Sequence, residues 1–561
     1  MTTNFKLKLL VVAVSSSVLL AACGGDDGKD GADGVNGKDL AAAPKLTRIA
    51  TVPLGAEITG IFKTDNGELF FNVQHPDDTL PAPENNAAVG AWVGVDFDNL
   101  DPMLTDIPVP ATGSDEAKTV QVIAGSYQAL GRAGDTFSGA LPFGFGATVN
   151  AAGNGLVRTS QDPDFNAYIA SNVDGSEGYL FTAFENRPGA MSRLALARQT
   201  DGTWAVNNAM NIDFSAVAGT LINCFGTVTP WGTPLTSEEN YEAENTVNWN
   251  NTAYSSGYPN YADVQFLQQY LGGTFPNPYD YGYIVEITQP AAAAPVPVKH
   301  FTLGRVAHEN VVVMPDKKTV YITDDGSDKG FYKFIANTAG DLSAGTIYAA
   351  KLSQDATKDI SKAGFDIEWI ALGSSSNAEI ESWINQYDGI DESNYVEGQT
   401  SYITDAEITD WAVNNVGDDR YAFLETLRAA KAKGATVEFR KMEGININYA
   451  GVASGAVPYM YVAMSEVAKG MSDNKGDIQL AENKCGAVYR FGIMSDYNVS
   501  RMEPALVGGA YDATAAENAC SVEGISNPDN LVVLNDGRVI VGEDTSKHSN
   551  NMMWVFNPQG K

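Results

Sequence analysis

From about residue 50 to the C-terminus, short runs of β-branched and aromatic residues alternate with Gly, Asp, Asn and Pro. Runs of this kind, separated by turn-forming residues, predict short β-strands joined by tight turns. Six of the runs end in a polar or acidic cluster, as if one structural unit were repeated. They cover residues 70–75, 181–186, 235–240, 321–325, 461–466 and 539–544.

A second repeated feature lies upstream of five of these runs. Four of its copies begin with a glutamate and the fifth with a cysteine: Glu57, Glu309, Glu443, Glu523 and Cys224. Repetition of a small β unit is typical of a β-propeller, in which the units are arranged radially as blades. The sequence therefore predicts an all-β fold, a six-bladed β-propeller with long loop and helical insertions. A pair of β-sandwiches is the alternative.

Two further expectations concern the ends of the chain and one insertion. The first unit begins at Glu57 and the last ends near Trp554, so we expect strands from the two termini to pair and close the ring. Within the insertions, Asp418 and Asp419 can cap a helix that ends before Gly434. We expect this helix to pack across a face of the propeller.

The N-terminus has the pattern of an export signal. Two lysines precede an apolar run over residues 9–22, which ends in Leu-Ala-Ala before Cys23. The run is short for a membrane span, and its end resembles the bacterial lipoprotein box, in which the cysteine is lipidated. An ordinary signal peptide with a chance cysteine is the alternative. We predict a signal peptide over 1–22, a flexible Gly- and Asp-rich tether over 23–45 and one propeller domain over 46–561.

These features describe an exported lipoprotein of the outer membrane or cell surface, facing the periplasm or the outside and held to the membrane by its lipid alone.

The charge balance excludes one class of partner. The 561 residues include 69 Asp and Glu against 36 Lys and Arg, a net charge of −33. Because sequence-independent nucleic-acid binding needs a basic surface, we expect no nucleic-acid partner. The same excess supplies carboxylates for hard cations.

The repeated acids define a candidate metal site. The innermost strand of each blade lines the channel of a propeller, so equivalent residues converge at one end of it. Carboxylates held close together raise one another's pKa, and bound cations relieve this repulsion. Carboxylate oxygens suit Ca²⁺, while a thiolate at Cys224 admits a softer metal such as iron. The alternative is that the glutamates cap turns or face solvent.

The other cysteines favour one disulfide. With Cys23 lipidated, an exported protein could pair two of the remaining three. Cys485 and Cys520 are the favoured pair because they flank one strand-like stretch. Cys224 is then left as a candidate ligand or nucleophile.

Histidines are scarce, and no His-x-x-x-His pair supports a typical zinc hydrolase site. No Gly-x-Ser-x-Gly elbow, Walker loop or dinucleotide-binding fingerprint stands out either. His308, beside Glu309, could support a ligand or touch a substrate. His300 and His548 are expected at the surface.

Several motifs together resemble one family, the PhoX-type bacterial alkaline phosphatases. The resemblance spans about residues 130 to 545. It is carried by residues 224–233, 235–240, 281–286, 304–309, 321–325, 331–334, 434–443 and 528–531. The unit at 57–76 also resembles the family, but typical relatives carry it at the C-terminus, as if this ring had been opened at a different point. Spatial neighbours survive such a permutation.

The resemblance implies a six-bladed propeller whose channel holds ferric iron and calcium and hydrolyses phosphate monoesters. It implies that Cys224 binds iron and that Glu309 and Glu443 are channel glutamates. Further metal or phosphate contacts would come from Glu239, Asn240 and Asp325. With the repeat positions Glu57 and Glu523, these residues form the expected site for Ca²⁺ and Fe³⁺.

One departure from the family affects phosphate binding. The family usually carries Arg-Pro-Glu where this chain has Lys441-Met442-Glu443. An arginine binds phosphate through two parallel hydrogen bonds, whereas a lysine supplies a point charge. Arg440 is adjacent but is expected on the other side of the strand. Ser237, where relatives often have cysteine, is a lesser change. Phosphate binding is therefore expected to be weaker, or the substrate different.

The predicted function is metal-assisted hydrolysis of small phosphate monoesters by a monomer that scavenges phosphate. We expect catalysis to depend on Glu309, Glu443, Lys441 and His308. A calcium-binding surface propeller that binds a ligand or partner without catalysis is the main alternative. A lactonase-like hydrolase on the same ring is a third reading, because a fold does not fix a function. Retention of Cys224 with the glutamates argues against it.

Overall fold

The computed structural model describes residues 44–559, apart from 242–245 and 256–259. The described residues belong to one compact unit. The predicted signal peptide, Cys23 and nearly all of the predicted tether lie outside the described residues, so these assignments stay predictions. Among the described residues, no helix is both long enough and apolar enough to cross a membrane.

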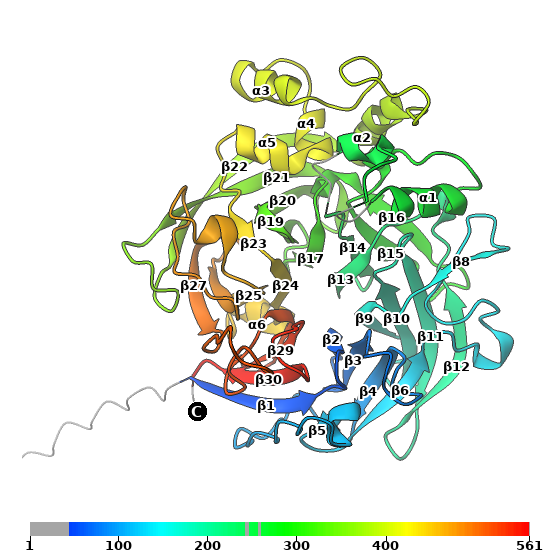
Figure 1. Ribbon diagram of the computed structural model, residues 1–561, viewed down its shortest axis with the longest axis vertical. Helices are drawn as coiled ribbons and strands as arrows, with labels where there is room; N and C mark the ends of the chain where they lie inside the picture. The colour runs from blue at the N-terminus through cyan, green and yellow to red at the C-terminus, as the bar shows by residue number, and fades with distance from the viewer. Residues whose placement is uncertain (1–43, 242–245, 256–259, 560–561) are drawn as a thin grey trace, which may run out of the picture. The chain divides into compact units, whose positions relative to one another are not determined.

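The described chain is built mainly on β-sheets whose strands pair antiparallel (Figure 1). One sheet contains β2 (Glu57–Lys63), β3 (Leu69–Gln74), β4 (Ala88–Val93) and β6 (Ser126–Arg132). The next contains β9 (Pro163–Ala170), β10 (Glu177–Phe184), β11 (Ala190–Arg198) and β12 (Trp204–Asn211). A third contains β13 (Asn223–Val228), β14 (Pro234–Glu238), β15 (Ile284–Thr288) and β16 (Val296–His300).

Two larger sheets complete the series. A nine-stranded sheet contains, in spatial order, β17 (His308–Val313), β18 (Thr319–Asp324), β20 (Phe331–Thr338), β21 (Asp341–Gln354), β22 (Phe365–Ser376), β27 (Val499–Val507), β26 (Ala487–Ile493), β25 (Tyr459–Met464) and β24 (Met442–Ile447). A five-stranded sheet contains β28 (Pro528–Val533), β29 (Val539–Glu543), β30 (Met552–Asn557), β1 (Lys45–Thr51) and β5 (Gln121–Val122). Two small pairs are β7 (Ala147–Val149) with β8 (Leu156–Thr159), and β19 (Ser327–Lys329) with β23 (Phe439–Arg440).

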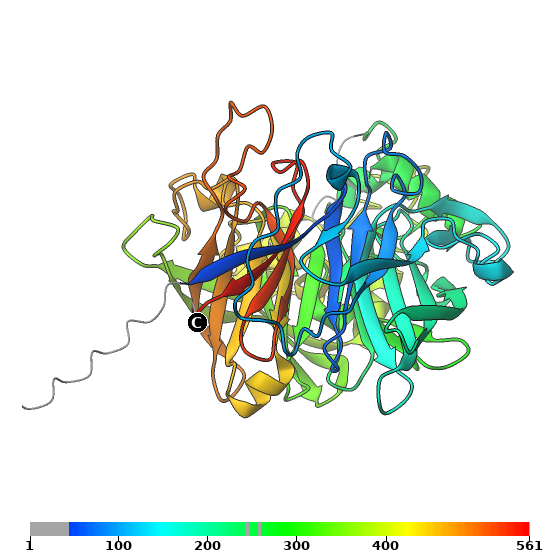
Figure 2. The same cartoon turned by 90° about the horizontal axis from the view of Figure 1, so that it is seen from below.

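The edge strands β2, β9, β13, β17, β24 and β28 lie around a common centre (Figure 1). Each contacts the next in this order, and β28 contacts β2 again. Seen at right angles, the sheets stand side by side with their strands roughly aligned (Figure 2). This radial order is that of a propeller-like fold and differs from a pair of β-sandwiches.

Strands from the two ends of the chain share one sheet. β1 pairs antiparallel with β30, from Lys45 opposite Asn557 to Thr51 opposite Met552. The blue and red strands in Figure 1 are this pair. The predicted closure of the ring by both termini is therefore confirmed.

The inner strands are buried on both faces. β17 and β28 are buried at every residue, without the alternation of a strand that faces water. Apolar side chains fill the space between neighbouring sheets. Between the first two sheets, for example, the ring of Phe70 lies 5.5 Å from the rings of both Tyr168 and Trp204. This packing between the sheets holds the first residues of each inner strand in place.

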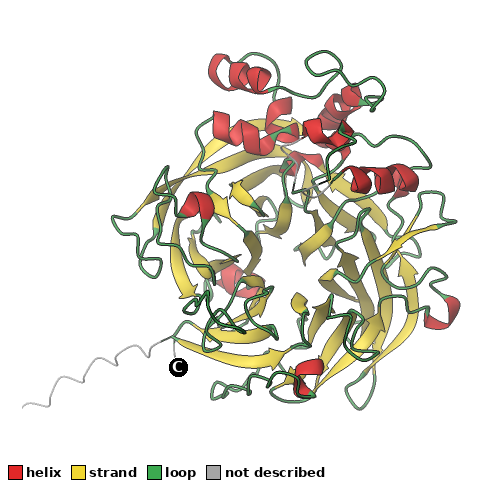
Figure 3. Ribbon diagram, viewed as in Figure 1, coloured by secondary structure: helices red, strands yellow, loops and turns green. Residues whose placement is uncertain are grey.

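The helices are α1 (Tyr261–Tyr270), α2 (Asn377–Ile384), α3 (Asp405–Asn414), α4 (Arg420–Leu424), α5 (Thr426–Ala432) and α6 (Tyr449–Ser454). Short 3₁₀ segments are Glu116–Lys118, Phe137–Gly139, Ser215–Val217, Thr246–Asn250, Pro278–Asp280, Phe301–Leu303, Asn385–Tyr387 and Lys469–Met471. The helix predicted after Asp419 is two helices, because Glu425 leaves helical geometry at φ −134° and ψ 46°. Helices α2 and α4 contact the outer strand β22, so this group lies at the outer edge of the sheets (Figure 3).

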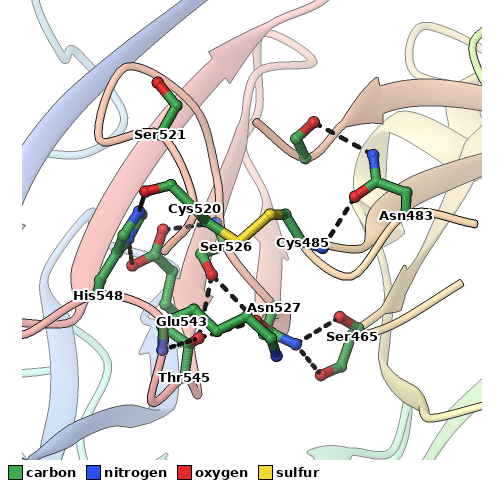
Figure 4. The surroundings of a disulfide bond; sticks show 12 residues. Ser465, Asn483, Cys485, Cys520, Ser521, Ser526, Asn527, Glu543, Thr545 and His548 are labelled. Carbon is green, nitrogen blue, oxygen red and sulfur yellow. Dashed lines mark hydrogen bonds and ion pairs between the residues drawn. A yellow bond between two sulfur atoms is a disulfide. The ribbon is translucent and has the colours of Figure 1, made fainter. Parts of the chain in front are cut away.

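The favoured disulfide is confirmed: Cys485 is bonded to Cys520, and Cys224 is a free, buried cysteine. The bridge ties the segment before β28 to the segment before β26 (Figure 4). The expectation that His300 and His548 lie at the surface is wrong. Both are buried because each pairs with a buried glutamate, at 2.7 Å and 2.9 Å respectively.

Candidate metal centre

Five inner strands present one ionisable side chain at the same place, the second residue of the strand. These residues are Asp164, Cys224, Glu309, Glu443 and Asp529. In all five strands the pairing register with the neighbouring strand shifts at this residue or directly after it. An irregularity of this kind bends the strand and re-aims a side chain. The repeated backbone feature therefore turns all five side chains toward the centre.

Two of the expected repeat positions are placed differently. In β2 the register shifts between Thr59 and Phe62, so Gly60 matches the ligand position and Glu57 lies before it. Glu523 is exposed and precedes β28, in which Asp529 takes the ligand position. The expectation that Glu523 is a metal ligand is therefore wrong, because its strand begins later than the sequence repeat indicated.

Cys224 lies between two of these carboxyl groups. Its Sγ lies 2.9 Å from both Asp164 Oδ2 and Glu309 Oε2, and the single thiol hydrogen can be donated to one of them at a time. Burial, and after it the charges of the same two acids, raises the pKa of the thiol. A cation bound among these three groups would reverse this, because it stabilises the thiolate.

Four overlapping sets of side chains are close enough to share a metal ion, with ligand atoms within 4.8 Å of one another. They are Asp164–Cys224–Glu309, Glu185–Cys224–Glu239, Glu239–Asp325–Glu443 and Glu309–Glu443–Asp529. The predicted residues Cys224, Glu239, Glu309, Asp325 and Glu443 are thus brought together. Three acids that sequence reasoning missed, Asp164, Glu185 and Asp529, join them.

Some oxygens of this cluster lack a partner within the described chain. Glu239 Oε2, Glu309 Oε1 and Asp325 Oδ1 are buried and make no hydrogen bond. A buried carboxylate oxygen without a partner costs considerable free energy. The donor set, hard carboxylate oxygens with one thiol, is that of a site for Ca²⁺ and for a softer metal such as iron. The residues present therefore fit the metals that the sequence implies.

The pKa shifts of the clustered carboxyl groups also indicate a site for cations. Burial is the main cause that raises the pKa of Glu239, Glu309, Glu443 and Asp529, and neighbouring carboxylates raise each of them further. Without cations, these groups hold their protons to higher pH than an ordinary carboxyl group does. With cations bound, they can ionise.

The cluster lines a cavity of about 560 Å³. Ten of its lining residues are acids: Glu57, Asp162, Asp164, Glu185, Glu239, Glu309, Asp325, Glu443, Asp529 and Asp544. Its basic residues are Arg187, Arg440, Lys441 and His75. Acids outnumber bases, so the cavity as a whole favours bound cations. We call it the acidic cavity.

Lys441 is the ammonium group nearest the acids. Its Nζ lies 3.3 Å from Glu443 Oε1 and 4.0 Å from Asp544 Oδ2. The charge of Glu443 is the main cause that raises the pKa of Lys441. Lys441 therefore keeps its positive charge into the alkaline range.

Arg440 also lines the acidic cavity, contrary to the expectation that it points to the other side of its strand. The reason is the backbone of Lys441, whose φ of 50° separates β23 from β24 and breaks the alternation of side chains. Arg440 Nε donates to Glu466 Oε2 at 3.1 Å, and Nη1 donates to Ser327 Oγ at 2.8 Å.

Three other expected site residues take supporting or peripheral places. His308 is fully buried and donates from Nε2 to the carbonyl of Gly304 at 2.8 Å, so it holds the turn before β17. Burial lowers its pKa to about 4. Neither His308 nor the buried Asn240 lines the acidic cavity. Glu57 does line it, at the rim, where Oε1 lies 2.6 Å from His75 Nε2.

Two sequence signals could have located the missed acids. Asp164 and Asp529 each follow a proline that begins an inner strand, as Pro163 and Pro528. Glu185 and Asp544 belong to the polar ends of the repeated runs, and five of the six runs, all but 461–466, contribute residues to the cavity. The runs indicate the number of blades, and the acids at their polar ends are also candidate metal ligands, as with Glu185, Glu239 and Asp325.

A comparison with protein families identifies this arrangement. The family described as alkaline phosphatase PhoX matches residues 181–561, more than half of the chain. The chain belongs to the PhoX family. The family is one of alkaline phosphatase-type phosphoesterases, and the carboxylate clusters of the cavity suit its metal dependence. No curated protein matches the sequence.

Solved structures resemble the chain to different degrees. The structure of Pseudomonas fluorescens PhoX in complex with vanadate, a transition-state analogue, is 19% identical with a TM-score of 0.50, over 74% of this chain and 81% of that one. A glucose dehydrogenase matches at 8% identity and a TM-score of 0.36, over 91% and 99%. The calcium structure of a Trichoderma reesei family AA12 carbohydrate-active enzyme matches at 11% and 0.35, over 93% and 99%. At 19% identity the likeness to Pseudomonas fluorescens PhoX concerns the fold alone, and the two matches with TM-scores below 0.5 carry no argument.

Proposed function

We propose that this PhoX family member hydrolyses phosphate monoesters at a centre of iron and calcium in the acidic cavity. The observation that carries the proposal is the convergence of Cys224 and the repeated carboxylates, some of whose buried oxygens have no partner among the described residues. Such a cluster needs cations to ionise. A cavity of about 560 Å³ suits small-molecule esters.

The donor types suggest how the metals divide. Cys224, with Asp164 and Glu309, would hold iron, because a thiolate favours the softer metal. Glu239, Asp325, Glu443 and Asp529 would hold calcium through oxygen alone. Bound there, the cations would supply Lewis-acid stabilisation of the charge on the phosphoryl oxygens.

The chain's own basic groups then bind the phosphoryl group. Lys441, beside Glu443, supplies a point charge where the family usually has an arginine. Arg440 and Arg187 line the same cavity and are placed to supply guanidinium donors. We infer that these arginines compensate for the substitution at 441. His308 acts indirectly, because its ring fixes the turn that leads to Glu309.

Further features of the fold and of the protein's biology are also proposed. We propose six blades, one for each inner strand, in which two blades joined where β22 pairs with β27 form the nine-stranded sheet. Residues 46–561 would act as one domain and as a monomer. The predicted lipid at Cys23 would hold the enzyme at the outer membrane or cell surface, where phosphate scavenging takes place.

Hydrolysis of an aryl phosphate, measured together with metal content, tests the proposal. We expect a chelator to abolish turnover and Glu443→Gln to lower it at least about 100-fold, because a cation ligand is lost. Glu523→Gln is the matched control, since that glutamate is exposed. Turnover that neither the chelator nor Glu443→Gln changes would contradict it.

The same assay separates the alternative of a surface protein that binds calcium without catalysis. The observation that favours this alternative is Lys441 in place of arginine. Such a protein would bind metal but hydrolyse no ester. Iron bound at Cys224 would count against it, because a binding module has no need of a thiolate–iron centre.

A further inference from the structure

A second cavity opens beside the acidic cavity. It has a volume of about 620 Å³, and Glu57, His75, Arg440, Lys441 and Asp544 line both spaces. We call it the vestibule. Because the two cavities share this wall, a molecule whose phosphoryl group lies at Lys441 extends into the vestibule with the rest of its atoms.

Most charges of the vestibule are already paired or bonded. Arg440 pairs with Glu466 at 3.1 Å, and Glu57 lies 2.6 Å from His75. Asp544 lies 4.0 Å from Lys441. The remaining acid, Asp77, accepts from the backbone and hydroxyl of Thr79, at 2.8 Å and 2.6 Å.

Lys547 is the exception. Within the described chain no carboxylate lies within 4.0 Å of its ammonium group, and its Nζ donates to Asn527 Oδ1 at 3.1 Å. Lys547 is half-buried and lines the vestibule but not the acidic cavity. Glu466 and Asp544 act on it only through longer-range charge interactions. A half-buried cation with no acid at salt-bridge distance among the described residues, in a cavity large enough for a ligand, is a site for an anion.

The backbone around Lys547 is held in place. Its N–H donates to Thr545 Oγ1 at 2.9 Å, and its carbonyl accepts from the backbone of Cys520 at 3.3 Å. Cys520 is fixed by the disulfide with Cys485, and Thr545 and Asn527 belong to the same hydrogen-bonded group (Figure 4). The ammonium group is therefore presented from a rigid segment, which favours specific binding.

We propose that the vestibule binds the leaving group of the ester and that Lys547 binds a second negative charge on it. The class of substrate is then a phosphate monoester whose alcohol carries a carboxylate or another phosphate. Lys547 and Lys441 both line the vestibule, so one small molecule can reach both. This inference rests on the proposed phosphatase activity.

Two substrates that differ at one group test it. Glycerol phosphate and phosphoglycerate share the phosphoester, and a carboxylate in the second replaces the terminal hydroxymethyl group of the first. With the metal-loaded enzyme and Ca²⁺ in excess, we expect kcat/KM to favour phosphoglycerate. We expect Lys547→Gln to lower this preference about tenfold, mainly through KM for phosphoglycerate. Lys547→Arg is expected to retain it, because the charge is kept.

Lys484→Gln is the matched control. Lys484 precedes Cys485 and does not line the vestibule, so its loss removes the same charge without touching the leaving group. An equal preference in wild type and Lys547→Gln, or an equal loss in Lys484→Gln, overturns the inference. If neither ester nor an aryl phosphate is hydrolysed, the proposed function itself has failed.

Discussion

The metal-free protein is expected to lose stability as the pH rises. Burial raises the pKa of the clustered carboxyl groups, most clearly those of Asp164, Glu239, Glu309, Glu443 and Asp529. The folded chain therefore keeps protons that the unfolded chain releases. The contribution of these groups to stability is complete below the pKa of an unfolded carboxyl, about 4, and is lost as the pH rises toward their folded pKa.

The size of the effect follows from the number of retained protons. Each one lowers the free energy of unfolding by about 1.4 kcal/mol per pH unit. The five groups interact, so we take two retained protons as the working number. Two protons retained between about pH 5 and about pH 7 correspond to a loss of about 5.6 kcal/mol, a large part of the stability of an ordinary domain.

Denaturant unfolding at a series of pH values measures this slope. We expect a steep decline for the chelated protein and little decline with Ca²⁺ and Fe³⁺ bound, because bound cations let the carboxyls ionise in the folded state. Glu443→Gln is expected to reduce the slope, and the exposed Glu523→Gln to leave it unchanged. A metal-free protein whose stability is flat over this range would refute the reasoning.

Three further predictions concern single features of the molecule. Cys224→Ser is expected to remove the iron signal from the purified protein while calcium binding and the circular dichroism spectrum persist, because the hydroxyl is a poor ligand for the softer metal; iron retained at full occupancy contradicts this. Lys441→Arg is expected to lower KM for an aryl phosphate several-fold, and Lys441→Met to lower kcat/KM about 100-fold, because the cation beside Glu443 is altered or lost; equal kinetics in all three proteins tells against the role of Lys441. Removal of the disulfide by Cys485→Ala and Cys520→Ala is expected to cost about 2–4 kcal/mol in denaturant unfolding, since a loop with a sequence separation of 35 is released; unchanged stability would show that the segment is held by its hydrogen bonds alone.

The repeat was visible in the sequence, but its register was not. The polar ends of the second strands place Glu239 and Asp325 in the cavity as expected. Glu523 resembles Glu443 in the sequence because Gly-Ile follows both residues. These residues do not say where the strand begins, and β28 begins at Pro528. The residue pattern alone therefore assigned Glu523 as a ligand in error and did not identify Asp529.

Backbone geometry explains the other differences. The φ of 50° at Lys441 turns Arg440 into the cavity, and nothing in the local sequence requires a lysine to adopt it. Burial of His300 and His548 depends on glutamates that the fold brings beside them. In contrast, the pairing of β1 with β30 could be predicted, because a ring whose units fill the chain from end to end closes by joining them.

The most direct test of the central claim is the hydrolysis of an aryl phosphate by the metal-free protein before and after the return of metals. The account predicts no turnover without metal, and recovery only when Ca²⁺ and iron are both added, with iron bound through Cys224. Full turnover in the absence of metal would contradict it. So would a fully metal-loaded protein that hydrolyses no phosphate ester.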